Sequence, residues 1–240
     1  MNLIARLLFS SLFIFLSVFL ASTSIQEAGE FQTDYKVSYV VEPTGTTNVS
    51  QSIVLKNKTA NFYADTFELK IGSTKVDNVK AQDSLGPLET NVKFDNNVTS
   101  ISVKFNQRVI GVDKTLPWTL TYSSRELATK SRQIWEISIP KVADSQDIGT
   151  YEASVLVPPT FGPVAFAVPQ PINSQAESRS QSFSFSKDQL TKSGIAMSFG
   201  EKQVFSFNLN YFLENNNLTT QIQSISLPPD NNYQKVVLIN

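Results

Sequence analysis

The sequence predicts an all-β fold of two antiparallel β-sandwich domains that follow an N-terminal signal or anchor helix. Apolar and polar residues alternate along many short segments, which is typical of strands with one buried face. Polar turns separate these segments at intervals of about 8 to 15 residues, as in sandwiches. A proline-rich stretch then divides the segments into two groups. Together these features favour two packed-sheet domains over a helical or α/β fold.

Residues 1–24 are typical of an export signal. Arg6 supplies the positive charge, Leu7–Leu20 is a largely apolar run, and the small residues Ala21–Ser24 follow. The run is shorter than the about 20 residues that a membrane-spanning helix needs. We expect cleavage near residues 21–24, with a retained membrane anchor as the alternative. In either case the remaining chain is expected to be extracytoplasmic, secreted or anchored to the cell membrane.

Residues 31–158 are predicted to form the first sandwich domain. Pro43–Thr46 is expected to be a hairpin turn, residues 75–81 and 88–94 are weaker strand candidates, and Ser124–Lys130 is the clearest helix signal in the chain. The residues expected to face the core are Tyr35, Val37, Tyr39, Val41, Val49, Ile53, Leu55, Phe67, Leu69, Ile71, Ile101, Val103, Phe105, Trp118, Leu120, Tyr122, Trp135, Ile137, Ile139, Tyr151, Ala153, Val155 and Val157.

A linker is predicted at 159–180, because residues 158–171 hold five of the eleven prolines and proline removes backbone donors. Residues 181–240 are then expected to form a second, incomplete β domain. Its predicted elements are a strand from about Gln181, a short helix at Lys187–Ser193 capped by Ser186, a long hairpin formed by residues 205–213 and 218–227, and a terminal strand at 236–240. Because that last strand is strongly apolar, we expect the natural polypeptide to continue beyond it.

The chain contains no histidine and no cysteine, which excludes a Ser-His-Asp triad, a Cys-His nucleophile, a disulfide and an ordinary zinc site. The 20 basic and 21 acidic residues are scattered without runs, so no nucleic-acid partner is expected. Four Asn-x-Ser/Thr sequons could carry sugar in a host that glycosylates proteins; they begin at Asn48, Asn57, Asn97 and Asn217.

The remaining candidates for chemistry are carboxylates and aromatic side chains. Asp144 and Asp147 are the best local carboxylate pair, although two acids in one polar loop usually just solvate a turn. Their loop and residues 95–97 lack the spaced ligand series of a calcium site. Trp118 and Trp135 are expected in the core rather than on a ligand platform. We therefore assign no catalytic, cofactor-binding or metal-binding residue, and no cofactor.

Two aromatic residues of the proline-rich stretch, Phe161 and Phe166, are left with two interpretations. They either pack the two predicted domains together or form an exposed docking patch.

Two segments carry a family resemblance: FQTDYKVSYVVEPTGTTNVSQSIVLKNKTANFYADTFELKIG (residues 31–72) and RQIWEISIPKVADSQDIGTYEASVLVPPTFGP (residues 132–163). They resemble the N-terminal β region of bacterial secreted or membrane-anchored transglutaminase-like proteins, over residues 31–240. More distantly, the pattern is similar to the N-terminal sandwich of zinc aminopeptidases and of ribophorin. The resemblance implies a non-catalytic support, since the family's Cys and His have no counterpart here.

Sequence and resemblance together predict a non-catalytic, extracytoplasmic scaffold or substrate-presenting region, not an enzyme. The catalytic domain of the transglutaminase-like parent would then follow in cis. The alternative is a self-contained cell-surface adhesion module for a glycan or protein. Expected partners are a protein or cell-envelope component, and the membrane if the N-terminal segment is retained.

Overall fold

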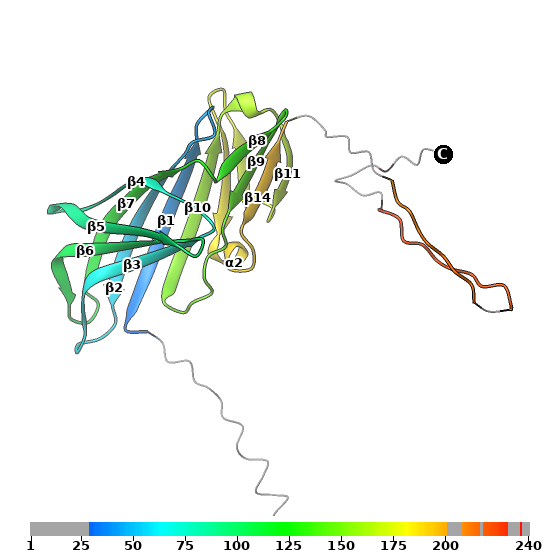
Figure 1. Cartoon of the computed structure of the whole chain (residues 1–240). Coiled ribbons are helices and arrows are strands. Elements are labelled where there is room, and N and C mark those ends of the chain that lie inside the picture. The colour runs from blue at the N-terminus through cyan, green and yellow to red at the C-terminus, as the bar shows by residue number, and fades with distance from the viewer. Residues whose placement is uncertain (1–28, 201–207, 217, 230–235, 237–240) are drawn as a thin grey trace, which may run out of the picture.

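The computed structural model describes residues 29–200, 208–216, 218–229 and 236 (Figure 1). The predicted leader at 1–24 lies outside these residues, as does the predicted terminal strand apart from Val236. Within the described part of the chain, no helix has the length and apolar character needed to cross a membrane.

The all-β prediction is confirmed, and the fold is sandwich-like. Among the described residues, the helical segments are η1 (Pro159–Phe161) and α2 (Lys187–Leu190). The strands are β1 (Phe31–Val41), β2 (Thr47–Asn57), β3 (Tyr63–Gly72), β4 (Asp77–Asp83), β5 (Gly86–Asp95), β6 (Val98–Ile110), β7 (Thr115–Ser124), β8 (Ala128–Ser131), β9 (Ile134–Ile139), β10 (Ile148–Val157), β11 (Val164–Val168), β12 (Asn173–Ala176), β13 (Gln181–Ser186) and β14 (Ile195–Phe199).

Ten strands form one long sheet in the order β12-β13-β10-β1-β2-β7-β4-β5-β6-β3. The sheet turns at β5, whose first residues pair with β4 while residues 89–95 pair with β6. Figure 1 shows β3, β5 and β6 crossing over the strands that include β1, β2 and β7. Phe67 and Phe105 accordingly contact the Trp118 ring on β7, with centroids 5.2 and 5.6 Å away. One end of the sheet is thus folded onto the other as a sandwich.

A second sheet, β11-β14-β9-β8, covers the other half of the long sheet. The rings of Phe183 on β13 and Phe199 on β14 lie 5.6 Å apart, edge to face, across this interface. The turn between β1 and β2 also lies against β9 of this second sheet. A Cβ on Gly45 in that turn would stand 2.8 Å from the Trp135 ring. The predicted inward residues of both halves contribute to one hydrophobic core.

One pair of strands departs from the antiparallel prediction. β1 pairs antiparallel with β2 over its whole length but parallel with β10, where Tyr35 lies opposite Tyr151. A parallel pair needs a long connection. Here that connection is the whole of β2 to β9.

The prediction that residues 159–180 form an unpaired, proline-rich linker is wrong. Residues 164–168 form β11, paired with β14, and residues 173–176 form β12, paired with β13. Pro163 and Pro169 flank β11 rather than interrupt it, so they remove no donor from within the strand.

β13 pairs with β10 and β14 with β9, so residues 181–199 belong to the same two sheets as the residues before the prolines. The predicted boundary therefore does not separate two sheet systems among the described residues. A separate unit formed by 201–240 stays a prediction, since much of that range lies outside the described residues.

The helix predicted at Ser124–Lys130 is also wrong, because β7 ends at Ser124 and β8 begins at Ala128. The connection is held by Glu126, whose Oε2 accepts a hydrogen bond from Lys75 N at 2.7 Å. Leu127 and Ala128 are buried. Strand pairing and burial here override local helix propensity.

The short helix predicted after Ser186 is confirmed as α2, although it ends at Leu190 rather than Ser193. Gln189 Oε1 accepts a hydrogen bond from Ser186 N at 3.1 Å, as in a capping box. In the predicted C-terminal hairpin, the Tyr211 hydroxyl donates to Ser226 O at 3.0 Å. The two sides run beside each other in Figure 1, with no regular strand among residues 208–216 and 218–229.

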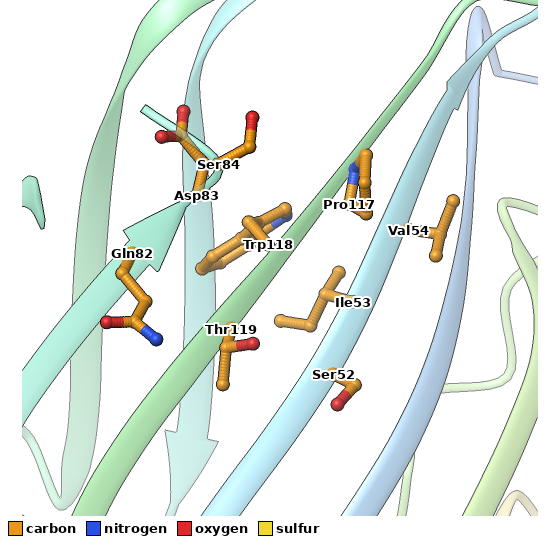
Figure 2. A pocket seen from close by; sticks show the side chains of 9 residues that line it. All are labelled: Ser52, Ile53, Val54, Gln82, Asp83, Ser84, Pro117, Trp118 and Thr119. Atoms are coloured by element: carbon orange, nitrogen blue, oxygen red, sulfur yellow. The ribbon is translucent and has the colours of Figure 1, made fainter. Parts of the chain in front are cut away.

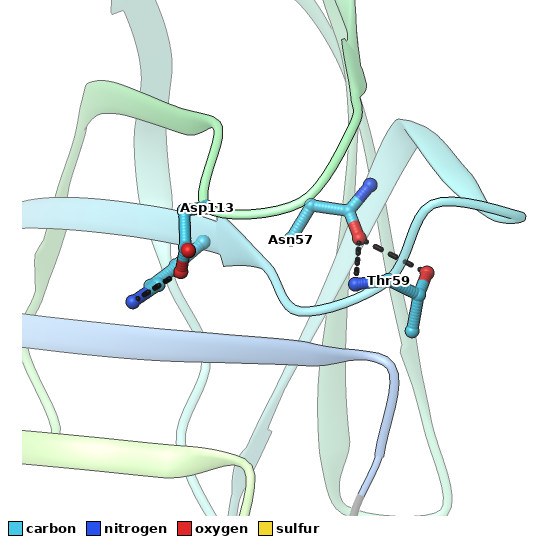
Figure 3. Close-up of polar contacts among 4 residues, drawn as sticks. Asn57, Thr59 and Asp113 are labelled. Carbon is cyan, nitrogen blue, oxygen red and sulfur yellow. Dashed lines mark hydrogen bonds and ion pairs between the residues drawn. The ribbon is translucent and has the colours of Figure 1, made fainter.

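Asn57, the acceptor of one predicted sequon, is instead a buried corner residue (Figure 3). Its Nδ2 donates to Phe62 O at 2.7 Å and to Val109 O at 3.0 Å. Its Oδ1 accepts from the Thr59 backbone N at 2.8 Å and from the Thr59 hydroxyl at 3.1 Å. The amide thus ties the end of β2 to the end of β6, and in the folded chain it is not accessible for glycosylation.

Replacement Asn57→Ala is expected to lower the free energy of unfolding by about 2–4 kcal/mol, because it leaves buried backbone carbonyls without donors. Urea unfolding followed by circular dichroism measures the change. Asn48→Ala is the matched control, since the Asn48 amide makes an exposed hydrogen bond to Glu42. Equal stability of the two variants would contradict the corner role.

Candidate functional site

A cavity of about 430 Å³ has a row of tyrosines as its floor. Tyr35 and Tyr39 alternate on β1, Tyr122 lies on β7 and Tyr151 on β10. Gln51 on β2 completes the floor. The period-2 pattern predicted that all four tyrosines face inward. It could not show that they would lie together.

Strand register brings these side chains together. The parallel pairing of β1 with β10 sets Tyr35 opposite Tyr151, and their ring centroids are 5.3 Å apart. The antiparallel ladders set Tyr39 opposite Val49, and Val49 opposite Tyr122. Because side chains of laterally adjacent residues share a face, the rings form one patch.

Two runs of consecutive residues form the walls. Glu68–Gly72 of the edge strand β3 lies on one side, and residues 139–143, which begin at the last residue of β9, lie on the other. Leu127 and Ile148 add apolar surface. The cavity therefore occupies the gap between the folded-back end of the long sheet and the second sheet.

The polar groups inside are uncharged and engaged with each other. Gln51 Nε2 donates to the Tyr122 hydroxyl at 3.3 Å, and Tyr39 and Tyr151 are hydrogen-bond partners. The nearest charges on β3, Lys70 and Glu68, form an exposed ion pair at 3.6 Å at the rim. A volume of this size, mostly apolar with a few polar groups, is typical of small-ligand sites.

Burial raises the pKa of all four tyrosines. Desolvation is the main cause for Tyr35, Tyr39, Tyr122 and Tyr151, and the charge that Tyr151 would carry adds to the rise in the first three. The phenols therefore stay protonated at neutral pH, as hydrogen-bond donors and acceptors. The charged side chains that line the cavity, Glu68, Lys70 and Lys141, belong to its walls, and the tyrosine floor itself is uncharged.

A second, shallower recess of about 310 Å³ lies where β2, β7 and β4 run side by side. Figure 2 shows Trp118 between Asp83 and Ile53. The Trp118 Nε1 and Asp83 Oδ2 are buried and have no hydrogen-bond partner among the described residues. Asp83 Oδ1 accepts from Leu85 N at 2.8 Å, which gives this carboxylate a structural role in the β4–β5 turn.

Of the two carboxylates singled out in the sequence, Asp147 binds the backbone. Asp147 Oδ1 accepts from Gly29 N at 2.9 Å, and its carbonyl accepts from Thr33 N at 2.7 Å, so this residue anchors the start of β1. Asp144 is exposed on the same loop. No cluster of three or more acidic side chains that could hold a metal occurs among the described residues.

The two tryptophans and Phe161 pack as core residues. Trp135 is stacked on Phe161, with centroids 4.1 Å apart and an interplanar angle of 2°, and both are buried. Phe161 is therefore a core residue and not part of an exposed patch, and whether it packs two domains together stays a prediction. Phe166 remains 41% exposed on β11, as the docking interpretation requires.

The buried tyrosines are expected to make stability depend on alkaline pH. Since their pKa values are raised in the folded state, the unfolded chain releases protons first as pH rises through 10. The free energy of unfolding should be level below about pH 9 and should fall above about pH 10. Denaturant titrations across this range measure it.

Tyr39→Phe should reduce the slope above pH 10, whereas Tyr63→Phe, at a half-exposed position, should leave it unchanged. Phenolate absorbance gives a second readout. Ionisation of all seven tyrosines near pH 10 in a chain that is still folded would contradict the buried, neutral floor.

No protein-family model matches this sequence, and the search of curated proteins finds no match either. Among solved structures, the M1 zinc metallopeptidase of Deinococcus radiodurans is similar at 10% identity with a TM-score of 0.44; the match covers 71% of this chain and 42% of that one. Native yeast LTA4 hydrolase is similar at 10% identity with a TM-score of 0.46, covering 74% of this chain and 31% of that one.

The chain therefore spans less than half the length of the enzymes it is similar to. At these identities and TM-scores, the similarity carries no inference about activity. The distant resemblance to zinc aminopeptidases noted in the sequence corresponds to these structures, whereas the transglutaminase-like resemblance finds no support in them.

Proposed function

We propose that this chain is a non-catalytic β-sandwich module that supports or presents a partner and carries out no reaction itself. The observation that carries the proposal is the absence of histidine and cysteine from the sequence, which removes the commonest general base and the thiol nucleophile. Tyr35, Tyr39, Tyr122, Tyr151 and Lys56 all have pKa values raised further above 10. A general acid or base works best with a pKa near the operating pH, and these groups move away from it.

Two finer parts of this proposal rest on the sequence alone. An extracytoplasmic location is supported by the Leu7–Leu20 run, and cell fractionation of the tagged chain tests it. A transglutaminase-like parent is supported by the resemblance of residues 31–72 and 132–163. The genomic reading frame tests it: a Cys-His-Asp domain after codon 240 supports this parentage, and an immediate stop codon contradicts it.

The purified chain is expected to show no turnover in assays of amine transfer to glutaminyl peptides or of amide and glycoside hydrolysis. The control is the double variant Asp144→Ala with Asp147→Ala, which removes the best local carboxylate pair. Turnover that disappears in this double variant, with folding retained by circular dichroism, would overturn the non-catalytic proposal.

A second candidate function, a binding module, is favoured by the tyrosine-floored cavity. Its floor offers phenol and amide hydrogen bonds beside apolar rings and holds no charge, while Glu68, Lys70 and Lys141 lie in the walls. The ligand class that fits this floor is neutral groups rich in hydroxyls or amides, as in glycans. The hydroxyls of Tyr39 and Tyr122 are the groups that would orient such a ligand.

On a glycan array, the full chain is expected to bind neutral sugars in preference to sialylated or sulfated ones. Gln51→Leu should weaken the affinity for the bound sugar about tenfold, because it removes the buried amide. Gln82→Leu, at an exposed position, should not change that affinity. Preference for acidic glycans, or equal binding by both variants, would contradict this assignment of the cavity.

A further inference from the structure

Four strands form the edges of the two sheets, and three of them carry polar or charged side chains. β12 is the short polar segment NSQA, β8 carries Lys130, and β3 carries Glu68 and Lys70. Such residues oppose pairing with another chain. The fourth edge, β11, has the sequence VAFAV and has no such protection.

The β11 edge is both apolar and open. Val164, Phe166, Val168 and the nearby Ile172 are 42%, 41%, 52% and 65% exposed. No charged residue occurs between Glu152 and Glu177. Figure 1 shows β11 on the outer side of its sheet. Because β11 pairs only with β14 in the described chain, the hydrogen-bonding groups on its other side are available.

Residues 208–229, which we name the C-terminal arm, have matching chemistry. Glu214 is the only charged residue in the arm. Phe212, Leu218 and Ile222 are almost fully exposed, so the arm buries little apolar surface against its own chain. The hydrogen bond from Tyr211 to Ser226 keeps the two sides of the arm together.

We propose that the C-terminal arm of one copy of this chain adds to the β11 edge of a second copy. Residues 208–213 are long enough to span the five residues of β11, and their backbone groups would satisfy the open edge while apolar side chains of both segments become buried. No charge is desolvated, because neither residues 208–213 nor β11 carries one.

The partner is a second copy because both surfaces stay exposed within a single chain. Reciprocal exchange of two identical arms closes a two-fold dimer, in which each arm occupies the other's edge. This inference is independent of the proposed function, since neither cavity residues nor recess residues take part.

The natural lack of cysteine allows a direct test, because two introduced cysteines have no competing thiol. One full chain carries Ala165→Cys on β11 and another carries Asn210→Cys in the arm; they are mixed, oxidised and separated on a non-reducing gel. We expect the mixed disulfide dimer at about fivefold or more the yield of a control pair that combines Asn210→Cys with Thr129→Cys on the β8 edge.

Equal yields from the two pairs would overturn the proposal. So would a disulfide that forms only when Ala165→Cys and Asn210→Cys share one chain, since that result would place the arm on its own β11.

Sedimentation of the full chain gives an independent readout. Phe166→Lys should weaken self-association about tenfold or more, because it puts a charge into the apolar edge. Val112→Lys, at an equally exposed apolar position outside β11, should not. Val164→Lys replaces the first variant if Phe166→Lys fails to fold. All variants share residues 7–20, so association through that run cancels. A parent chain that is monomeric, or β11 variants that associate as strongly as the parent chain, would refute the exchange.

Discussion

The parallel pairing of β1 with β10 is the constraint on which the rest of the molecule depends. It joins segments more than a hundred residues apart, and through β10 it brings β13 onto the long sheet. β14 then continues the chain into the second sheet, where it pairs with β9 and β11. A slip of one residue in the β1–β10 register would turn Tyr151 away from Tyr35 and move the apolar face of β10 into solvent.

The cavity is a consequence of how the two halves of the sandwich are built. The folded-back end of the long sheet and the second sheet do not merge, so β3 and the residues after β9 leave a gap above β1. Tyrosines suit such a place because each ring covers apolar neighbours while its hydroxyl finds a partner. The floor of the gap therefore consists of neutral groups, and charged side chains line only its walls.

Period-2 alternation predicted the inward residues of β1, β2, β7, β9 and β10 well, because in a half-buried strand the buried and exposed side chains alternate along the local sequence. Two predictions from local sequence were wrong because each segment pairs with another strand. Prolines around β11 indicated a break, yet β14 supplied its ladder; a helix signal after Ser124 yielded to the pairing of β8 with β9. The sequence predicted Asn57 as a sequon residue. Its structural role was not visible, because its side chain donates to backbone carbonyls of residues 5 and 52 positions away.

The sequence by itself determined the all-β class, the faces of most strands and the absence of imidazole and thiol chemistry. Only the tertiary structure decided which strands are neighbours, and hence the grouping of four tyrosines, the corner at Asn57 and the open edge at β11. The physical reason is that side-chain alternation is a property of each strand alone, whereas pairing and register come from the burial of one shared core by segments far apart in the chain.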